Sequence, residues 1–324
     1  MRVLLAGWPS FLHGEATAGD VLSMEAVGRT LAGAGVDYDM AWSPVFRPHA
    51  LHLDAVEPDR YDSLVFTCGP LHGEQVRELH QRFVRCHRVA VGVSVIDPDD
   101  PAVTGFHTVL ARDGTGSVPR RDLAGGPRPA SVPLVGLTLS LGQGEYGRRR
   151  RHEDVAERLR GWLGRHDCAR LALDTRLDSR SWGYCATPAQ LESLVRRLDL
   201  IVTTRLHGLV LALKNGIPAL AVDPVAGGAK VTAQARAWGW PAVIPAEDLL
   251  PESGQPSQGH SPRTGPEPAD PAASAPGEAL LARWWHWCLS EAGNAAARAH
   301  ATTPHHRDEP LLDELLQVIG ERAS

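Results

Sequence analysis

Short apolar runs alternate along the chain with longer segments of helical spacing. The clearest run covers residues 199–203, where β-branched side chains are frequent enough for a buried parallel strand. A predicted helix over 209–213 follows, and Asn215-Gly216 is a strong signal for its end. Residues 217–222 form the next predicted strand. The same alternation recurs before and after this stretch, which predicts a parallel sheet covered by helices on both faces.

The predicted strands fall into two series, separated by a proline-rich stretch at 127–133. Strands of the first series are predicted at residues 2–6, 36–42, 61–68 and 89–95. Strands of the second series are predicted at residues 134–140, 170–174, 199–203, 217–222 and 242–244. We therefore expect an α/β fold with two Rossmann-like, doubly wound domains, at residues 1–128 and 131–250.

The chain changes character after residue 250. Residues 251–277 hold seven prolines, four glycines and four serines, which leaves little to bury and predicts a disordered linker. Residues 278–324 follow as a predicted helical tail, with helices over 278–298 and 311–319. Three tryptophans in the first of these helices predict that it docks on one of the two domains.

Composition narrows the classes of function. A net charge of -5 argues against a nucleic-acid partner or an anionic membrane surface. No apolar run reaches the roughly 18 residues that a membrane-spanning helix needs, and we see no signal-peptide pattern. The five cysteines are scattered and the histidines lack ligand spacing, so we expect no disulfide framework and no metal site. These features favour the cytoplasm.

Arg205, His207 and Gly208 lie between the strand at 199–203 and the helix that follows. Open α/β sheets bind ligands at the carboxyl ends of their strands, and a helix N-terminus favours anions. Residues two apart share a face in an extended segment but not in a helix. We therefore expect an extended chain through His207 and a helix that begins at Gly208, whose small size lets backbone N–H groups approach an anion. The structural alternative is an arginine paired with a carboxylate and a histidine that caps the helix.

Two further positions can extend this candidate anion site. Lys230, one of only two lysines in the chain, follows a glycine-containing loop at another predicted helix N-terminus. It can therefore face the same cleft as Arg205. Gly19-Asp20, after the first strand, can present a carboxylate into a cleft between the domains. A solvated lysine and an aspartate near a helix start are the corresponding structural explanations.

Residues 142–147 fit the pattern G-x-G-x-x-G. They follow a predicted strand, and Asp174 ends the next one, as in a dinucleotide-binding site. Against this interpretation, the helix begins only after the four arginines at 148–151, whereas the fingerprint needs its third glycine inside the helix. A surface loop is one alternative. A loop that helps to hold a phosphate or an acidic sugar is another.

In these features the sequence resembles the polysaccharide pyruvyl transferase family. The resemblance is strongest from 198 to 240 and is carried by T-R-L-H-G at 204–208, G-I-P at 216–218 and Lys230. Gly19-Asp20 and Arg112-Asp113 support it over residues 1–250.

The resemblance implies two Rossmann-like domains that face each other across a cleft, as in GT-B glycosyltransferases. It implies transfer of a pyruvyl group from phosphoenolpyruvate to a sugar of a polysaccharide or other glycoconjugate, with formation of a ketal and release of phosphate. Phosphoenolpyruvate is then the donor substrate, a glycan is the acceptor, and no cofactor is required. His207 and Arg205 become the catalytic residues. Substrate binding falls to Gly19, Asp20, Arg112, Gly208 and Lys230.

Two other functions stay open at this point. One is a GT-B sugar transferase or epimerase that uses a nucleotide sugar, since it shares the fold and the anion-binding helix end. The other is a non-catalytic binding protein. Family members commonly carry an arginine just after the first strand of the second domain, and residues 136–141 contain none.

Overall fold

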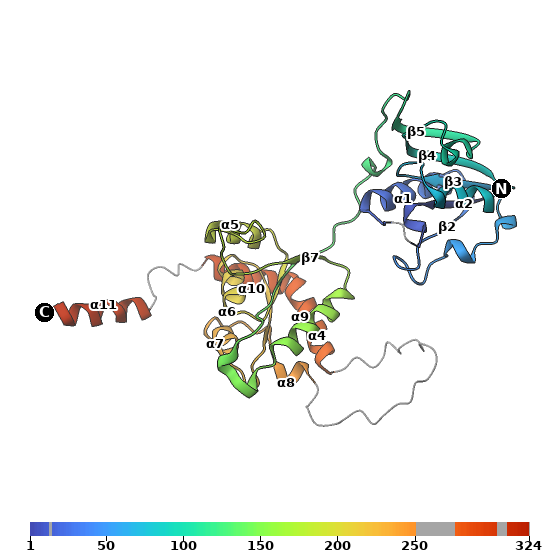
Figure 1. Ribbon diagram of the computed structural model, residues 1–324. Coiled ribbons are helices and arrows are strands. Elements are labelled where there is room, and N and C mark those ends of the chain that lie inside the picture. Colours follow the sequence, from blue (N-terminus) through green and yellow to red (C-terminus); the bar gives the residue numbers. More distant parts are fainter. Residues whose placement is uncertain (13–14, 251–275, 303–309, 324) are drawn as a thin grey trace. The chain divides into compact units, whose positions relative to one another are not determined.

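The computed structural model describes residues 1–12, 15–250, 276–302 and 310–323. The chain divides into two compact units, Met1–Pro129 and Ala130–Ser324. Within the described residues, each unit contains one five-stranded sheet in which all paired strands run parallel (Figure 1). The predicted α/β class with two doubly wound sheets is confirmed.

The first unit has the strand order β2-β1-β3-β4-β5. Its strands are β1 (Arg2–Gly7), β2 (Asp37–Met40), β3 (Ser63–Thr67), β4 (His87–Val95) and β5 (Thr108–Gly114). Its α-helices are α1 (Ala18–Gly33), α2 (Glu74–Arg82) and α3 (Pro101–Thr104). Short 3₁₀ helices occur at Trp8–Ser10, Leu53–Ala55, Pro58–Arg60 and Leu123–Gly125.

Helices cover both faces of the first sheet, because side chains alternate between the faces along each strand. Leu4 and Ala6 of β1 belong to the buried cluster that includes Val76 of α2. Leu5 points to the opposite face, where it is buried with Met24 of α1. The apolar run at the start of the chain therefore fills two cores rather than one.

The apolar pattern did not predict β5. This strand carries Arg112 and Asp113, and none of its residues is fully buried. It forms one edge of the sheet and pairs with β4. An edge strand buries fewer side chains than a central strand, so polar residues interrupt the apolar run on which the prediction rests.

The second unit has the order β10-β9-β8-β6-β7. Its strands are β6 (Leu134–Thr138), β7 (Ala169–Ala172), β8 (Leu200–Thr203), β9 (Ala219–Asp223) and β10 (Val243–Pro245). Its helices are α4 (His152–Gly164), α5 (Pro188–Val195), α6 (Leu206–Lys214), α7 (Lys230–Ala237), α8 (Ala246–Leu249), α9 (Pro276–Leu289), α10 (Glu291–Thr302) and α11 (Pro310–Ala323). A 3₁₀ helix covers Gly144–Arg149. Every residue of β8 and β9 is buried, as the apolar runs of central parallel strands predict.

The tryptophan-rich helix α9 packs on the second unit. Leu281 and Cys288 are buried in the same cluster as Val222 of β9. The ring of Trp285 meets that of Trp162 in α4 edge to face, with 5.5 Å between the ring centroids. Residues 251–275 of the predicted linker lie outside the described residues.

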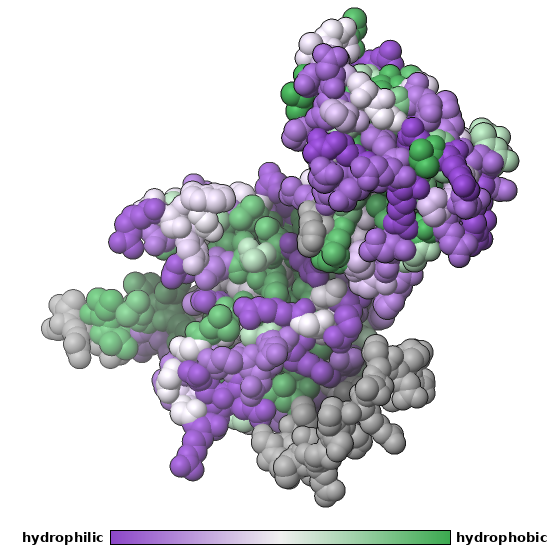
Figure 2. Space-filling view, turned by 45° about the vertical axis from the view of Figure 1, so that its right-hand side comes forward, coloured by the Kyte–Doolittle hydropathy of each residue, from purple (hydrophilic) through white to green (hydrophobic). Residues whose placement is uncertain are grey.

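Helix α11 carries a set of exposed hydrophobic side chains, which give it the apolar surface visible in Figure 2. They are Leu311, Leu312, Leu315, Leu316, Val318 and Ile319. Neither this helix nor any other in the described ranges has the length and apolar character needed to cross a bilayer.

Candidate functional site

The second sheet has its topological switch point between β6 and β8. The chain leaves β6 for β7 on one side, then returns to β8 on the other side. Ligands of open α/β sheets bind outside the carboxyl ends of the strands at such a point. Thr138, Thr203 and Asp223 end β6, β8 and β9, and all three are buried polar residues. The strand order and the polar side chains thus mark the same edge of the sheet.

Arg205 bridges this switch point. It follows β8, and its Nε donates a 2.8 Å hydrogen bond to the carbonyl oxygen of Leu139, just beyond β6. Its Nη2 lies 3.4 Å from a carboxylate oxygen of Asp174, just beyond β7. The side chain keeps 30% of its surface exposed. These contacts fix the guanidinium across three strand ends, and no hydrogen bond or ion pair within the described residues engages its Nη1.

The prediction of an extended chain through His207 is wrong. Helix α6 begins at Leu206, and the extended conformation ends at Arg205, with φ -106° and ψ 136°. Thr203 causes the early turn, because its Oγ1 accepts a 2.9 Å hydrogen bond from the backbone N–H of Arg205. His207 is therefore the second residue of the helix, and it is exposed. It does not share an extended face with Arg205.

Gly208 has a steric role that the sequence did not reveal. A Cβ atom at this position would lie 2.2 Å from Oγ1 of Thr203, so only glycine lets α6 pack this closely on the end of β8. The first helical hydrogen bond runs from Leu209 N to Arg205 O, so the N–H groups of Leu206, His207 and Gly208 have no partner within the helix.

Lys230 lies at the same sheet edge as the first residue of α7. The buried carboxylate of Asp223 positions it by accepting hydrogen bonds from the backbone N–H groups of Ala229, at 2.7 Å, and Thr232, at 2.9 Å. The Lys230 Nζ lies 5.7 Å from the centre of the Tyr146 ring. Lys230 therefore lies against the glycine-rich segment after β6.

That glycine-rich segment does not form a dinucleotide-binding turn. Gly147 has a φ of 52° in the 3₁₀ helix, and α4 begins only at His152. His152 is buried, its Nε2 lies 3.3 Å from Oε1 of Gln143, and burial lowers the pKa of the imidazole. Arg150 and Arg151 form ion pairs with acidic residues of the first turn of α4. The third glycine thus stays outside the helix, as the sequence indicated.

Asp20 and Arg112 lie in the first unit, where local contacts account for both. Thr17 caps α1: its Oγ1 accepts from the Asp20 N–H at 3.2 Å and donates to the Asp20 carboxylate at 2.7 Å. Arg112 donates to Asp113 at 2.6 Å, to Ser94 at 2.8 Å, and to Asp122. Hydrogen bonds from Ser94 and Arg112 lower the pKa of the Asp113 carboxyl. Gly19, beside Asp20, is exposed.

The structure therefore brings Arg205, Gly208 and the α6 N-terminus together, with Lys230 further along the same sheet edge. Gly19, Asp20 and Arg112 belong to the other unit. Sequence reasoning missed Asp174 as the partner of Arg205 and Thr203 as the residue that turns the chain. Asp174 was visible only as the end of a predicted strand. Among the described residues, no group of three or more His, Cys, Asp or Glu side chains is placed to hold a metal ion.

Comparison with known proteins bears on this region directly. The family model of polysaccharide pyruvyl transferase matches residues 160–224, which include Arg205, His207 and Gly208. The match indicates a transferase domain of this kind. Gly19, Asp20, Arg112 and Lys230 lie outside the matched residues. A comparison with curated proteins finds no significant sequence match.

Several solved glycosyltransferases resemble the chain weakly. The spinosyn rhamnosyltransferase SpnG is 13% identical, with a TM-score of 0.33, over 98% of this chain and 100% of that one. The spinosyn forosaminyltransferase SpnP is 13% identical, with a TM-score of 0.31, over 98% and 99%. The E. coli heptosyltransferase WaaC with ADP is 12% identical, with a TM-score of 0.23, over 76% and 93%. TM-scores this low support no inference about activity.

Proposed function

We propose that this protein is a pyruvyl transferase that moves a pyruvyl group from phosphoenolpyruvate to a sugar of a polysaccharide or other glycoconjugate, and releases phosphate. The observation that carries the proposal is the position of Arg205. It lies at the switch point of the second sheet, next to the open N-terminus of α6, inside the region that matches the family. Phosphoenolpyruvate is a cytoplasmic metabolite, so we place the reaction in the cytoplasm.

The donor carries two anionic groups, and the site offers two kinds of anion-binding group. Leu139 holds Arg205 at Nε and Asp174 holds it at Nη2, which leaves the N–H groups of Nη1 for a carboxylate or phosphate oxygen. The first N–H groups of α6 offer a second anchor, which the helix dipole strengthens. Lys230 is the further cation that we assign to the donor, and its Nζ lies 5.7 Å from the centre of the Tyr146 ring.

The chemistry requires a proton at the methylene carbon of the donor. Protonation leaves positive charge on the neighbouring carbon, and a first sugar hydroxyl attacks that carbon and loses its proton. The bond from this carbon to the phosphate oxygen then breaks, phosphate leaves, and a second hydroxyl closes the ketal with loss of its proton. We assign the first proton transfer to His207, because it is exposed in the first turn of α6, beside the proposed donor site. No cofactor takes part in these steps.

The proposal is tested by measuring phosphate release from phosphoenolpyruvate in the presence of a panel of glycans, with mass spectrometry of the products to detect the ketal. The expected result is phosphate release that depends on one class of glycan. Release of a nucleotide from nucleotide sugars instead would identify the alternative GT-B sugar transferase. Binding of phosphoenolpyruvate in calorimetry without any product would identify a non-catalytic binding protein.

The two lysines of the chain provide a matched pair of variants. Lys230→Ala removes the proposed donor cation, and we expect the KM for phosphoenolpyruvate to rise about tenfold, the effect of one charged hydrogen bond. Lys214→Ala removes a lysine at the other end of α6, which is paired with Glu192 at 2.6 Å. It should leave the KM unchanged. Equal effects of both variants would contradict the assignment of Lys230.

A further inference from the structure

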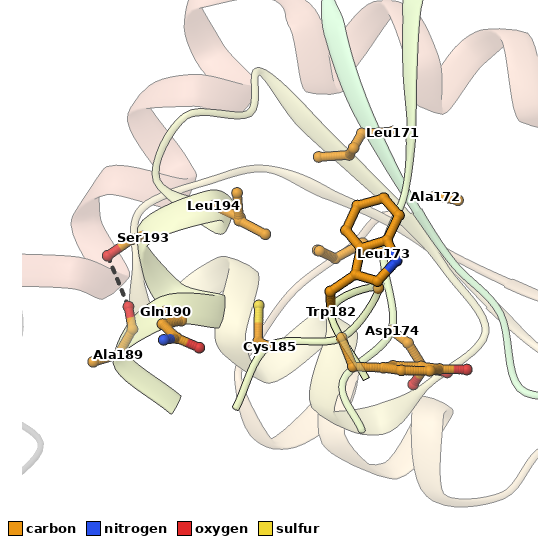
Figure 3. Close-up of a pocket in the computed structure, with 12 residues that line it drawn as sticks. Leu171, Ala172, Leu173, Asp174, Trp182, Cys185, Ala189, Gln190, Ser193 and Leu194 are labelled. Carbon is orange, nitrogen blue, oxygen red and sulfur yellow. Dashed lines mark hydrogen bonds between the residues drawn. The ribbon is translucent and has the colours of Figure 1, made fainter. Parts of the chain in front are cut away.

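The second unit contains a pocket of about 630 Å³ beside the edge strand β7. It lies between that strand, the loop over residues 174–187 and helix α5 (Figure 3). Its volume is in the range of small-molecule sites. Its lining includes apolar, aromatic and acidic side chains, namely Leu171, Leu173, Leu194, Trp182, Tyr184 and Asp174.

Trp182 is the unusual residue of this pocket, because its relative exposure is 101%. Figure 3 shows its indole at the pocket, and Leu173 and Leu194 are among the other residues that line the pocket. A large aromatic ring that the rest of the chain leaves uncovered, at a pocket lined in part by leucines, presents a flat apolar face to a ligand. Tyr184 lines the same pocket and carries the Arg176 guanidinium over its ring at 4.0 Å.

The polar groups of the pocket favour a neutral, hydroxyl-rich ligand. Asp174 is the one charged residue among the described residues that line it. Its Oδ1 accepts a hydrogen bond from the Arg176 N–H at 2.8 Å, which leaves Oδ2 as the acceptor for a ligand. Gln190 accepts from the Ala186 N–H through Oε1 and keeps its amide N–H groups as donors. A nucleoside diphosphate would bring further negative charge beside this carboxylate, and the nearest guanidinium groups, those of Arg176 and Arg205, already contact Tyr184 and Asp174. A sugar ring presents an apolar C–H face for an indole, and hydroxyls that suit both a carboxylate and an amide.

Asp174 also connects this pocket to the proposed donor site. The same carboxylate that lines the pocket lies 3.4 Å from Nη2 of Arg205. A ligand that hydrogen-bonds Asp174 from the pocket side is therefore one residue away from the guanidinium at the switch point.

We infer that this pocket is a sugar-binding subsite, in which Trp182 stacks on a ring of the acceptor glycan and Asp174 accepts a hydrogen bond from one of its hydroxyls. That the sugar belongs to the acceptor rests on the proposed function. That the pocket binds a sugar does not, because it follows from the lining alone. We expect the pocket to prefer neutral sugar rings to phosphorylated or nucleotide ligands, because Asp174 is the one charged side chain among its described lining residues.

Saturation-transfer NMR on the full chain tests the sugar site directly, with methyl glucoside, methyl galactoside and methyl mannoside as probes and thymidine diphosphate as the nucleotide. We expect saturation of the ring C–H protons of at least one glycoside. Trp182→Ala should weaken this binding about tenfold, the scale of one aromatic stacking contact with its buried area. Trp182→Phe should recover part of it. Leu177→Ala, on the same loop but outside the pocket, should change nothing.

Binding that is equal in Trp182→Ala and the unchanged protein would overturn the inference, as would binding of thymidine diphosphate alone or of none of the probes. Failure of the proposed function looks different. Glycoside binding that depends on Trp182, without phosphate release from phosphoenolpyruvate, would retain the sugar site and reject the transferase. Phosphate release with an unchanged KM for the glycan in Trp182→Ala would retain the transferase and reject the sugar site.

Discussion

The two units share one strand order but differ in what lies at the switch point. In the first unit, this point lies between β1 and β3, and the Trp8 ring lies directly over Gly69 there. A Cβ atom at Gly69 would come within 2.1 Å of the Trp8 ring. The Nε1 of Trp8 donates a hydrogen bond to the carbonyl oxygen of Pro70 at 3.2 Å. In the second unit, the corresponding position between β6 and β8 holds Arg205 and the open first turn of α6. The same topology thus makes an end covered by an aromatic ring in one unit and, in the other, an end with an oriented arginine beside the first N–H groups of a helix.

The arginines of the two units show the same contrast. Arg112 has all three of its side-chain nitrogens engaged by Asp113, Asp122 and Ser94. Arg205 is held at Nε and Nη2, and no hydrogen bond or ion pair within the described residues engages its Nη1. A guanidinium whose nitrogens all have partners stabilises its unit, whereas one that is oriented but keeps a nitrogen without a partner can bind a ligand. The difference lies in the neighbours and not in the residue type.

The largest effect that we expect is on turnover. His207→Ala should lower kcat by on the order of 100- to 10,000-fold, the usual contribution of a general acid, with an unchanged melting temperature because the residue is exposed. His72→Ala, an exposed histidine of the first unit that pairs with Asp100, is the control and should keep full activity. Phosphate release assays with calorimetric melting check both variants. If His207→Ala kept its activity, another residue would be the acid.

A smaller effect on activity should come from replacing the planar guanidinium of Arg205. Arg205→Lys keeps the charge but loses the planar donor geometry, so kcat/KM should fall about 10- to 100-fold with little loss of stability. Arg112→Lys should instead lower the melting temperature of the first unit, because it breaks an ion-pair network. Steady-state kinetics and thermal melts of the two variants should therefore show opposite patterns. Parallel losses of stability in both would remove the contrast between the units.

Two glycines near helix starts allow a stability test of the same contrast. Gly208→Ala places a Cβ 2.2 Å from Oγ1 of Thr203, and we expect a loss of about 1–3 kcal/mol in the free energy of unfolding. A Cβ atom at Gly19 meets only Thr17 Oγ1, at 3.8 Å. Gly19→Ala should therefore raise the free energy of unfolding by about 0.4–1 kcal/mol, because it lowers the conformational entropy of the unfolded chain. Urea unfolding measures both.

The smallest effect concerns acid sensitivity, to which the half-buried His80 of the first unit and the buried His152 of the second contribute. Burial lowers the pKa of His80 and of His152 below their ordinary value of 6.5, and the Nδ1 of each is buried without a partner. Below about pH 6.5 the unfolded chain therefore binds more protons than the folded chain. The contribution of these histidines to the free energy of unfolding is present above this pH and is lost as the pH falls. His80→Gln and His152→Gln should each flatten the dependence of unfolding free energy on pH between 7 and 5. A steeper slope in either variant would contradict the sign.

The apolar pattern was informative wherever strands are buried on both sides. The bounds of β8 were predicted within one residue, and those of the central strands β3, β4, β6 and β9 within two, because most of their positions face a core. The edge strand β5 was missed, since half-exposed residues carry no continuous apolar run. The start of α6 was misplaced by two residues, because the Thr203 side chain, rather than the small size of Gly208, sets the turn.

The sequence by itself determined the α/β class, the two series of strands and the presence of Arg205, His207 and Gly208 between a buried strand and a helix. These follow from local spacing and from residue types that act within a few positions of each other. The tertiary structure alone decided which groups surround Arg205. Leu139 and Asp174 reach it from two other strand ends, because the order of β7, β6 and β8 places distant parts of the chain at one edge.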